Sequence, residues 1–194
     1  MTVIISVAAY CAGLVVNDLA DYAEDLRERP GRPLPSGGVS RGTAIGMAVF
    51  FMVVALGAAA AVNGAVLIVT GLLLGEILWY NMVAKKHALM APLAMGLCRG
   101  LSVLVGAEAI GPAPRMAMVA AGAITLYIAG ITALARTETR NPRIPPLIGT
   151  LIRGLLFIQA GFCMAAGGSG WVAGVLLLAL WPVSRLVGRH FYAS

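Results

Sequence analysis

Charged residues are scarce in this chain of 194 amino acids. Asp, Glu, Lys and Arg together make up 11% of the sequence, whereas soluble domains carry about 25%. So few charged groups cannot cover the surface of a globule of this size. Apolar residues make up 60% of the chain and fall in runs of 14 to 23 residues with almost no charge inside them. The composition therefore predicts a membrane protein, for which the bilayer is the solvent.

Cysteine is also rare, and its spacing indicates neither a disulfide nor a metal site. Cys11, Cys98 and Cys163 lie inside apolar runs without a CxxC or Cys/His pattern, as expected of small apolar side chains. The net charge of +6 would suggest nucleic acid as a partner of a soluble protein. Here the basic residues lie in short loops between apolar runs, where they set the topology, so we expect no nucleic-acid partner.

Seven apolar segments divide the chain. From the second onward each is close to the roughly 20 residues that a helix needs to cross about 30 Å of hydrocarbon. The first is shorter and, as a helix from Met1, reaches only about 24 Å. The segments are Val3–Val16, Thr43–Val62, Ala65–Val83, Ala88–Ile110, Met116–Ala135, Pro146–Ala166 and Trp171–Val187. They predict an all-α polytopic bundle, a single transmembrane domain over residues 1–194, with loops at 17–42, 84–87 and 136–145.

The loop charges predict an orientation. Of the 14 Lys and Arg residues, eleven follow the first, third, fifth and seventh segments, and only Arg115 lies in the opposite connections. Because Lys and Arg collect on the cytoplasmic side, the longer loops and the C-terminus are expected there. The first residue then faces outside, without the charged start of a signal peptide and on a short helix. We therefore expect an upstream span to be missing from this chain.

Four oxygen-bearing side chains follow the first segment, in the stretch NDLADYAED. On a continuous helix Asp18, Asp21 and Asp25 stand at i, i+3 and i+7, and Asn17 precedes Asp21 by four, so their oxygens converge on one face. Mg²⁺ held by one or two carboxylates takes its other ligands from water and substrate phosphates, and would relieve the repulsion between these charges. The alternative is an ordinary charged loop that stops a membrane helix.

This acidic stretch and the RPLPSG that follows it resemble the NDxxDxxxD motif and its tail in the UbiA superfamily of intramembrane prenyltransferases. The Tyr80, Asn81, Lys85 and Lys86 stretch and MGLCRG at Met95–Gly100 extend the resemblance. It implies an all-helical fold around a lipid-open cavity, a polyprenyl diphosphate bound through Mg²⁺, and transfer of the prenyl chain to an acceptor. Members commonly have nine helices, and these seven would correspond to the second to eighth, with the first missing.

One part of the family pattern is absent. The second acidic motif, DxxxD, should follow Ala135, but Arg136–Arg143 carries one carboxylate among three arginines. Either the arginines bind the diphosphate directly in place of a second metal, or the protein no longer ionises an allylic diphosphate. The ARTE stretch and the C-terminal sequence resemble the EboC-like branch, for which the family picture includes handling of a secondary-metabolite precursor.

Charged residues inside the apolar segments need either a partner or a wet cavity. Arg99 lies twelve residues past His87, about 18 Å deep, and Glu76 lies about 13 Å from the same face. Two interpretations are open. The first is a buried ion pair of Glu76 with Arg99 or Arg153. The second is a cavity floor that contacts an acceptor.

The leading hypothesis is a prenyltransferase of the cytoplasmic membrane of a prokaryote, with membrane lipid around it. Its expected partners are a polyprenyl diphosphate and an unknown lipid-soluble or aromatic acceptor. Mg²⁺ would be the cofactor. The alternatives are a non-catalytic protein that binds or translocates a precursor, and a channel or purely structural protein. The expected metal ligands are Asn17, Asp18, Asp21 and Asp25, and the three aspartates are also the expected catalytic residues. The expected diphosphate-binding residues are Arg32, Tyr80, Lys85, Lys86, Arg136 and Arg140.

Overall fold

The computed structural model describes residues 1–111, 115–137 and 144–191, and the side chains of residues 187–191 are not described. Every regular element within these ranges is a helix. In chain order they are α1 (Thr2–Ala20), α2 (Tyr22–Glu28), α3 (Arg41–Ala60), α4 (Gly64–Met82), the 3₁₀ helix η1 (Ala84–Lys86), α5 (Met90–Glu108), α6 (Arg115–Ala135), α7 (Ile144–Ala165) and α8 (Gly170–Phe191). The predicted all-α bundle is therefore confirmed.

Six of these helices are long and apolar enough to cross a membrane: α1 and α3 to α7. Helix α8 offers a shorter apolar stretch, Gly170–Leu186, so seven spans stays a prediction. Helix α1 continues to Ala20, beyond the predicted end at Val16. Its 19 residues rise about 28 Å, so the first helix is longer than the apolar run alone predicted.

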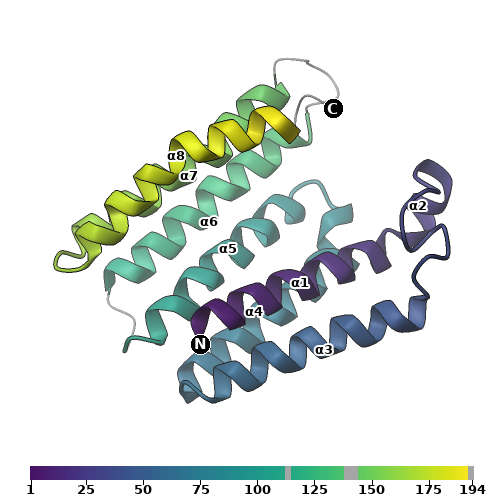
Figure 1. The fold of residues 1–194 in the computed structure, drawn as a ribbon, viewed down its shortest axis with the longest axis horizontal. Coiled ribbons are helices and arrows are strands. Elements are labelled where there is room, and N and C mark those ends of the chain that lie inside the picture. Colours follow the sequence, from purple (N-terminus) through teal and green to yellow (C-terminus); the bar gives the residue numbers. More distant parts are fainter. Residues whose placement is uncertain (112–114, 138–143, 192–194) are drawn as a thin grey trace.

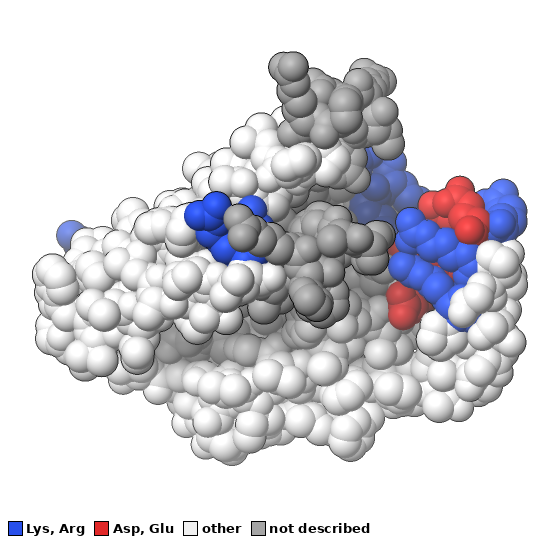
Figure 2. Space-filling view, turned by 45° about the horizontal axis from the view of Figure 1, so that its top comes forward, with Lys and Arg blue, Asp and Glu red and all other residues white. Residues whose placement is uncertain are grey.

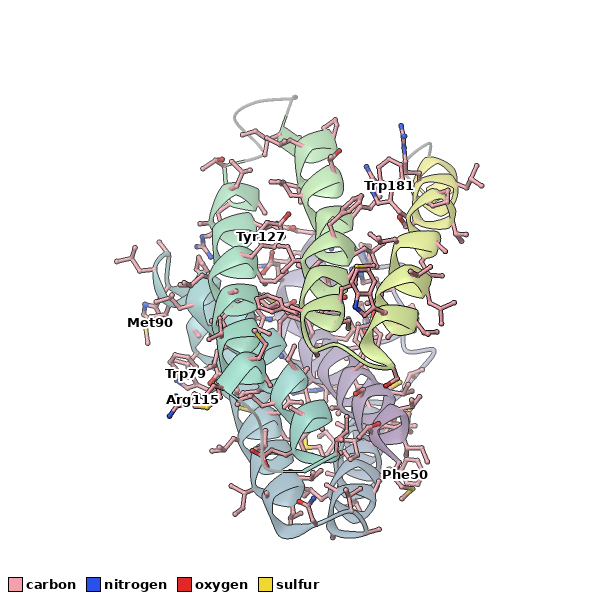
Figure 3. The ribbon with its side chains drawn as sticks, turned by 90° about the vertical axis from the view of Figure 1, so that its left-hand side faces the viewer. Phe50, Trp79, Met90, Arg115, Tyr127 and Trp181 are labelled. Atoms are coloured by element: carbon pink, nitrogen blue, oxygen red, sulfur yellow. The ribbon has the colours of Figure 1, made fainter. Side chains whose placement is uncertain are left out.

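The bundle has two halves joined by α5 (Figure 1). On one side α1 packs against α3 and α4, and on the other α6 packs against α7, which pairs with α8. Helix α5 contacts both α4 and α6. The buried core of the first half includes Ile5, Val66, Leu73 and Val105. Outward-facing apolar side chains such as Phe50 (Figure 3), 61% exposed, give this bundle the surface expected of a protein in lipid.

Glycines bring α5 and α6 into close contact. A Cβ on Gly96 would lie 2.2 Å from the Thr125 carbonyl oxygen, and one on Gly100 would lie 2.2 Å from Thr125 Oγ1. Small residues allow such approaches between membrane helices, where van der Waals packing drives association. Gly71 and Gly75, in contrast, have no atom within 4 Å of an added Cβ. Glycine therefore serves close packing at only some of its positions.

The second half of the bundle is tied by two polar and aromatic contacts (Figure 3). The Tyr127 hydroxyl on α6 donates to the Leu151 carbonyl oxygen on α7 at 2.7 Å. Between α7 and α8 the rings of Phe157 and Trp181 pack edge to face, with centroids 5.9 Å apart. These contacts hold α7 against both of its neighbours.

Candidate functional site

The acidic stretch does not form the single helix that its spacing suggested. Helix α1 ends at Ala20, and Asp21 is both its C-cap and the N-cap of α2. Two backbone bonds shape this break: Asp21 N–H donates to the Asn17 carbonyl at 2.9 Å, and Asp25 N–H donates to the Asp21 carbonyl at 2.8 Å. The prediction of one continuous helix is therefore wrong, because the helix is interrupted at Asp21, between Asp18 and Asp25.

The turn that follows α2 brings Arg32 back to the carboxylates. Arg32 Nη1 donates to Asp25 Oδ2 at 2.7 Å and lies 3.6 Å from Asp18 Oδ1. Within the RPLPSG sequence, Ser36 N–H donates to the Arg32 carbonyl at 2.9 Å, and Gly37 adopts a φ of +78°, a conformation that favours glycine. The sequence of this turn thus positions the guanidinium against the acidic residues.

The Asp25 carboxylate is the buried member of this cluster, since its side chain is only 6% exposed. A buried carboxylate needs a paired charge, which Arg32 supplies. The hydrogen bond to Asp25, together with the charge of that carboxylate, raises the pKa of Arg32 above its ordinary value. Arg32 is therefore a permanent cation at this site.

A second cation reaches the acidic residues from the connection between α4 and α5. The Lys85 ammonium on η1 forms an ion pair with the Asp21 carboxylate, and both side chains are partly buried. At the end of α6, Arg136 Nη1 donates to the Lys85 carbonyl oxygen at 3.3 Å. Three segments far apart in sequence therefore meet at one end of the bundle, which we call the loop end.

The distribution of charge follows this arrangement. In Figure 2 the visible Asp and Glu side chains gather at one end of the molecule, beside Lys and Arg side chains, and most of the remaining surface is uncharged. Carboxylates and cations at the edge of an apolar bundle form a polar site for an anionic ligand. The carboxylates can bind a metal ion carried by the ligand, and the cations can bind the ligand directly.

The described side chains offer a divalent cation two neighbouring carboxylates and no larger cluster. Within the described residues, no three His, Cys, Asp or Glu side chains gather into a cluster that could hold a metal. Asp18 and Asp25, however, lie close enough to share one positive group, Arg32. Mg²⁺ needs only one or two protein carboxylates when water and substrate phosphates complete its shell. These two residues are thus compatible with Mg²⁺ that a phosphate ligand brings with it.

A cavity of about 360 Å³ extends from this site into the bundle between α1, α4 and α5. Asn17, Tyr80 and Asn81 line the part nearest the loop end, and Arg99 and Ser102 line it from α5. The rest of its wall is largely apolar. A cavity of this volume with a few polar groups is typical of small-molecule sites.

Helix α5 separates this cavity from a second one. The second cavity, of about 520 Å³, lies between α5, α6 and α7 and is lined mainly by aliphatic side chains, such as Ile128 and Leu155. Both cavities share Met95, Arg99 and Ser102. Arg99 is therefore the charged residue common to the two cavities.

The predicted intramembrane ion pair is not formed among the described residues. Neither Arg99 nor Glu76 takes part in an ion pair, and Arg153 donates instead to Thr150 Oγ1 at 3.3 Å. Glu76 Oε1 is buried without a hydrogen-bond partner. The interpretation that paired these charges is wrong, and the geometry of Arg99 favours the alternative of a cavity wall.

The other predicted residues differ in how closely they join the site. Tyr80 lines the first cavity, and Asn17 lies beside it at the end of α1. Lys86 is exposed at the loop end. Arg140 lies outside the described residues. Of the described residues predicted to bind diphosphate, Arg32 and Lys85 are thus the ones that form ion pairs with the acidic side chains.

Asn81 and Ser102 are polar residues of the cavity that were not predicted from the sequence. Asn81 is 4% exposed, and its Nδ2 donates to the Ile77 carbonyl at 2.8 Å, which leaves Oδ1 buried without a partner. The Ser102 hydroxyl donates to the Cys98 carbonyl at 2.9 Å. Asn81 belongs to the stretch that carries the family resemblance, whereas the only sequence signal of Ser102 is a polar residue within an apolar run, which does not tell whether it faces a cavity.

Comparison with known proteins matches the chain to a family and to a curated relative. The sequence pattern of the UbiA prenyltransferase family matches residues 1–191. A digeranylgeranylglyceryl phosphate synthase of Methanothermobacter thermautotrophicus is 31% identical over 102 residues, which are 52% of this chain and 36% of that protein. The aligned region is thus little more than a third of the relative's length.

Two solved structures share the fold. A structure of a digeranylgeranylglyceryl phosphate synthase has a TM-score of 0.66 at 17% sequence identity. The match covers 94% of this chain and 72% of the chain in that structure. The apo structure of a UbiA homologue from Aeropyrum pernix K1 has a TM-score of 0.62 at 20% sequence identity. That match covers 95% of this chain and 79% of the homologue's chain. At these identities the similarity concerns the helical architecture alone.

Proposed function

Because the chain belongs to the UbiA prenyltransferase family, we propose that it binds a prenyl diphosphate at the loop end and transfers the prenyl group to an acceptor within the membrane. The observation that carries this proposal is the meeting of Asp18, Asp21 and Asp25 with Arg32 and Lys85 beside an apolar cavity. Such a site suits a ligand with a charged head and a hydrocarbon tail.

In this proposal the acidic residues hold Mg²⁺ and the basic residues hold the diphosphate. Asp18, Asp25, Asp21 and Asn17 offer oxygen ligands of the kind that Mg²⁺ prefers. The metal would neutralise charge on the leaving diphosphate. Arg32 and Lys85 now pair with the carboxylates, and a metal there would free their donors for phosphate oxygens. Arg136 and Tyr80 are close enough to the same end to contribute, and Lys86 and Arg140 are further candidates.

The reaction moves the prenyl group from a diphosphate oxygen to an oxygen or carbon atom of the acceptor. The bond between the first carbon of the prenyl group and the diphosphate oxygen breaks, and the diphosphate leaves with the electron pair. The acceptor's nucleophilic atom bonds to that carbon and releases its proton to water or to the departing diphosphate. Protein cations around the diphosphate stabilise the charge that develops on it.

We further propose that the loop end and the C-terminus face the cytoplasm, in the cytoplasmic membrane of a prokaryote. The support is the uneven distribution of Lys and Arg between the two sets of loops. Fusing a reporter that is active only in the cytoplasm after Ser194, and separately within residues 111–114, tests the orientation. We expect activity from the C-terminal fusion alone, and the opposite pattern would reverse the topology.

A non-catalytic binding or translocation protein is the second candidate. It is favoured by the sequence after Ala135, where three arginines and Glu138 stand in place of a paired acidic motif. Such a protein would keep the diphosphate site and lose the means to ionise the ligand. Both candidates therefore bind the ligand, but only the enzyme consumes it.

Turnover distinguishes the two. Purified protein in nanodiscs is incubated with labelled geranylgeranyl diphosphate, with aromatic and glycerol-type acceptors, and with either Mg²⁺ or EDTA. The enzyme should release inorganic diphosphate and form a labelled lipid in Mg²⁺ only. Mg²⁺-dependent binding without any product across the acceptor panel would favour the binding protein, and no binding at all would reject both.

A further inference from the structure

The segment that follows Asp21 leaves the bundle and returns to it. In Figure 1, α2 lies beyond the end of α1, and the chain then returns to the start of α3. We call residues 22–40 the strap. Among the described residues α2 contributes little to the packing of the helices, and Leu34, 8% exposed, is the buried apolar side chain of the strap. The position of the strap therefore depends largely on individual side-chain contacts.

A stacking contact joins the two ends of the strap. Arg41 is the first residue of α3 and Tyr22 the first residue of α2, and the Arg41 guanidinium lies over the Tyr22 ring with its Cζ 4.9 Å from the ring centroid. This distance is within the range of a cation–π interaction. The Thr43 N–H donates to Ser40 Oγ at 3.0 Å, and this cap holds the start of α3, which carries Arg41. Tyr22 and Arg41 thus close the strap at its base.

A second closure lies inside the first and carries a candidate metal ligand. Asp25 pairs with Arg32 at 2.7 Å, within the loop that the stacking contact closes. Tyr22 follows Asp21 directly, and the Asp25 N–H donates to the Asp21 carbonyl oxygen at 2.8 Å. The Tyr22 ring therefore belongs to the same turn of backbone as two of the candidate metal ligands. A displacement of Tyr22 would move both carboxylates.

The two closures respond differently to a metal ion. A metal bound by Asp25 would displace Arg32 from that carboxylate. A metal bound by Asp21 would displace Lys85 in the same way. The stacking contact contains no carboxylate, so a metal does not compete for it, and the attraction between the guanidinium and the ring remains when the ion pairs are exchanged. The stacking contact is therefore the closure of the strap that persists in a metal-bound site.

We infer that Tyr22 and Arg41 are positioning residues, whose stacking keeps Asp21 and Asp25 in place while a metal and a diphosphate are bound and so slows release of the ligand. This inference rests on the proposed transferase function and adds to it two residues that act through the carboxylates and not on the substrate. Because the contact holds a segment that already carries the bound metal, its loss should raise the dissociation rate more than it changes the association rate.

The rate of ligand release tests this inference. The whole protein in zwitterionic nanodiscs is loaded with Mg²⁺ and labelled geranylgeranyl S-thiolodiphosphate, a non-cleavable analogue, and release is followed in excess unlabelled analogue. We expect Arg41→Gln and Tyr22→Leu each to raise the dissociation rate about threefold, as the loss of a partly exposed cation–π contact predicts. Tyr22→Phe keeps the ring and should release the analogue at the wild-type rate. Wild-type rates in both Arg41→Gln and Tyr22→Leu would overturn the inference.

Two further variants separate stacking from charge. Arg27 is an exposed cation of the strap whose Nε donates to the Ala23 carbonyl oxygen at 3.3 Å, so Arg27→Gln removes the same charge and should leave the release rate unchanged. The double variant Tyr22→Leu/Arg41→Gln should release the analogue no faster than Arg41→Gln, because both changes remove one contact. An equal increase in Arg27→Gln would show an effect of net charge, and additive effects in the double variant would show that Arg41 acts independently of Tyr22. Either result would contradict the inference.

Hydrogen exchange in EDTA, without ligand, separates this inference from its premise. Arg32→Gln removes the inner closure, as a bound metal would. In that background Arg41→Gln should speed exchange of strap amides about threefold, including that of Val39, which donates to the Pro33 carbonyl oxygen at 2.9 Å. Amides of α4 and α5 should not change, which shows that the bundle is folded. Unchanged exchange in the strap would overturn the inference and leave the proposed function standing, whereas failure of the wild type to bind the analogue in Mg²⁺ would reject the proposed function and this role with it.

Discussion

Lys85 forms an ion pair with Asp21 across 64 residues of sequence, and so joins the connection between α4 and α5 to the break between α1 and α2. Both side chains are partly buried, at 15% and 27% exposure. The pair places a flexible cation beside a carboxylate that a metal would also use. Its loss should therefore affect both folding at the loop end and binding of an anionic ligand.

Replacing Lys85 should show both effects. Lys85→Gln leaves the Asp21 charge without its partner, so we expect the free energy of unfolding to fall by about 2 kcal/mol and the affinity for a prenyl diphosphate to fall with it. Lys85→Arg keeps the charge and should recover most of both losses. Chemical denaturation in detergent measures the free energy of unfolding, and calorimetry measures the affinity. A Lys85→Gln variant with wild-type stability would show that the ion pair does not stabilise the fold.

Arg32 should act differently, because it competes with a metal for the same carboxylates. Arg32→Gln frees Asp25, so Mn²⁺, used as a spectroscopic substitute for Mg²⁺, should bind more tightly in the absence of substrate. The same variant should bind the diphosphate less tightly, because a donor is lost. Electron paramagnetic resonance of Mn²⁺ gives the first affinity. Weaker Mn²⁺ binding in the variant would contradict the competition.

The raised pKa of Arg32 also predicts where its contribution to stability is insensitive to pH. A cation whose pKa is higher in the folded state stabilises fully below its unfolded pKa, which for arginine lies far above neutral pH, and loses that contribution only as the pH rises through the folded value. Its effect on the order of residues 22–36 should thus be constant between about pH 6 and 9. Hydrogen exchange, corrected for intrinsic rates, measures this. A loss of protection in that range that disappears in Arg32→Gln would contradict the prediction.

Arg136 lies at the rim of the site, and its replacement should have a small effect. It is exposed and donates to a backbone carbonyl, not to a carboxylate. Because exposed charges contribute little, we expect Arg136→Ala to weaken diphosphate binding by under about 1 kcal/mol. A loss of about 2–5 kcal/mol, as for a desolvated charge pair, would instead indicate that Arg136 closes over the ligand.

Close packing of α5 on α6 gives a prediction about stability alone. In Gly96→Ala the new methyl group would overlap the Thr125 carbonyl, so we expect a loss of about 1–3 kcal/mol. Gly75→Ala, in open space on α4, is the matched control and should be neutral or slightly stabilising. Thermal unfolding in one detergent compares them, and equal melting temperatures would refute the packing argument.

The helices could be predicted from the sequence because their signal is local. The predicted segment Ala65–Val83, for example, lies one residue from α4 at each end. Runs of apolar residues are bounded by polar loops, and the bilayer fixes the length of a spanning helix. The same signal misjudged α1, whose last turn contains Asn17 and Asp18 and is therefore polar although helical.

The contacts of the site could be predicted only in part. Proximity of the acidic stretch to Lys85 followed from the family resemblance, but the pairing of Arg32 with Asp25 depends on how the RPLPSG turn folds. The environment of Arg99 depends on the rotation of α5 about its axis, which a uniformly apolar sequence does not define. For the same reason the sequence did not distinguish Gly96, where an added Cβ would meet α6, from Gly75, where an added Cβ would meet no atom within 4 Å.

The central claim is that the acidic loop end binds a prenyl diphosphate through a divalent metal, and one calorimetric comparison tests it most directly. Geranylgeranyl S-thiolodiphosphate is titrated into the wild type, Asp21→Asn and Glu24→Gln, each with Mg²⁺ and with EDTA. Glu24 is an exposed carboxylate of α2 and serves as the control. We predict tight binding to the wild type and Glu24→Gln in Mg²⁺ only, and at least about tenfold weaker binding to Asp21→Asn. Equal affinity in EDTA, or in Asp21→Asn, would contradict the claim.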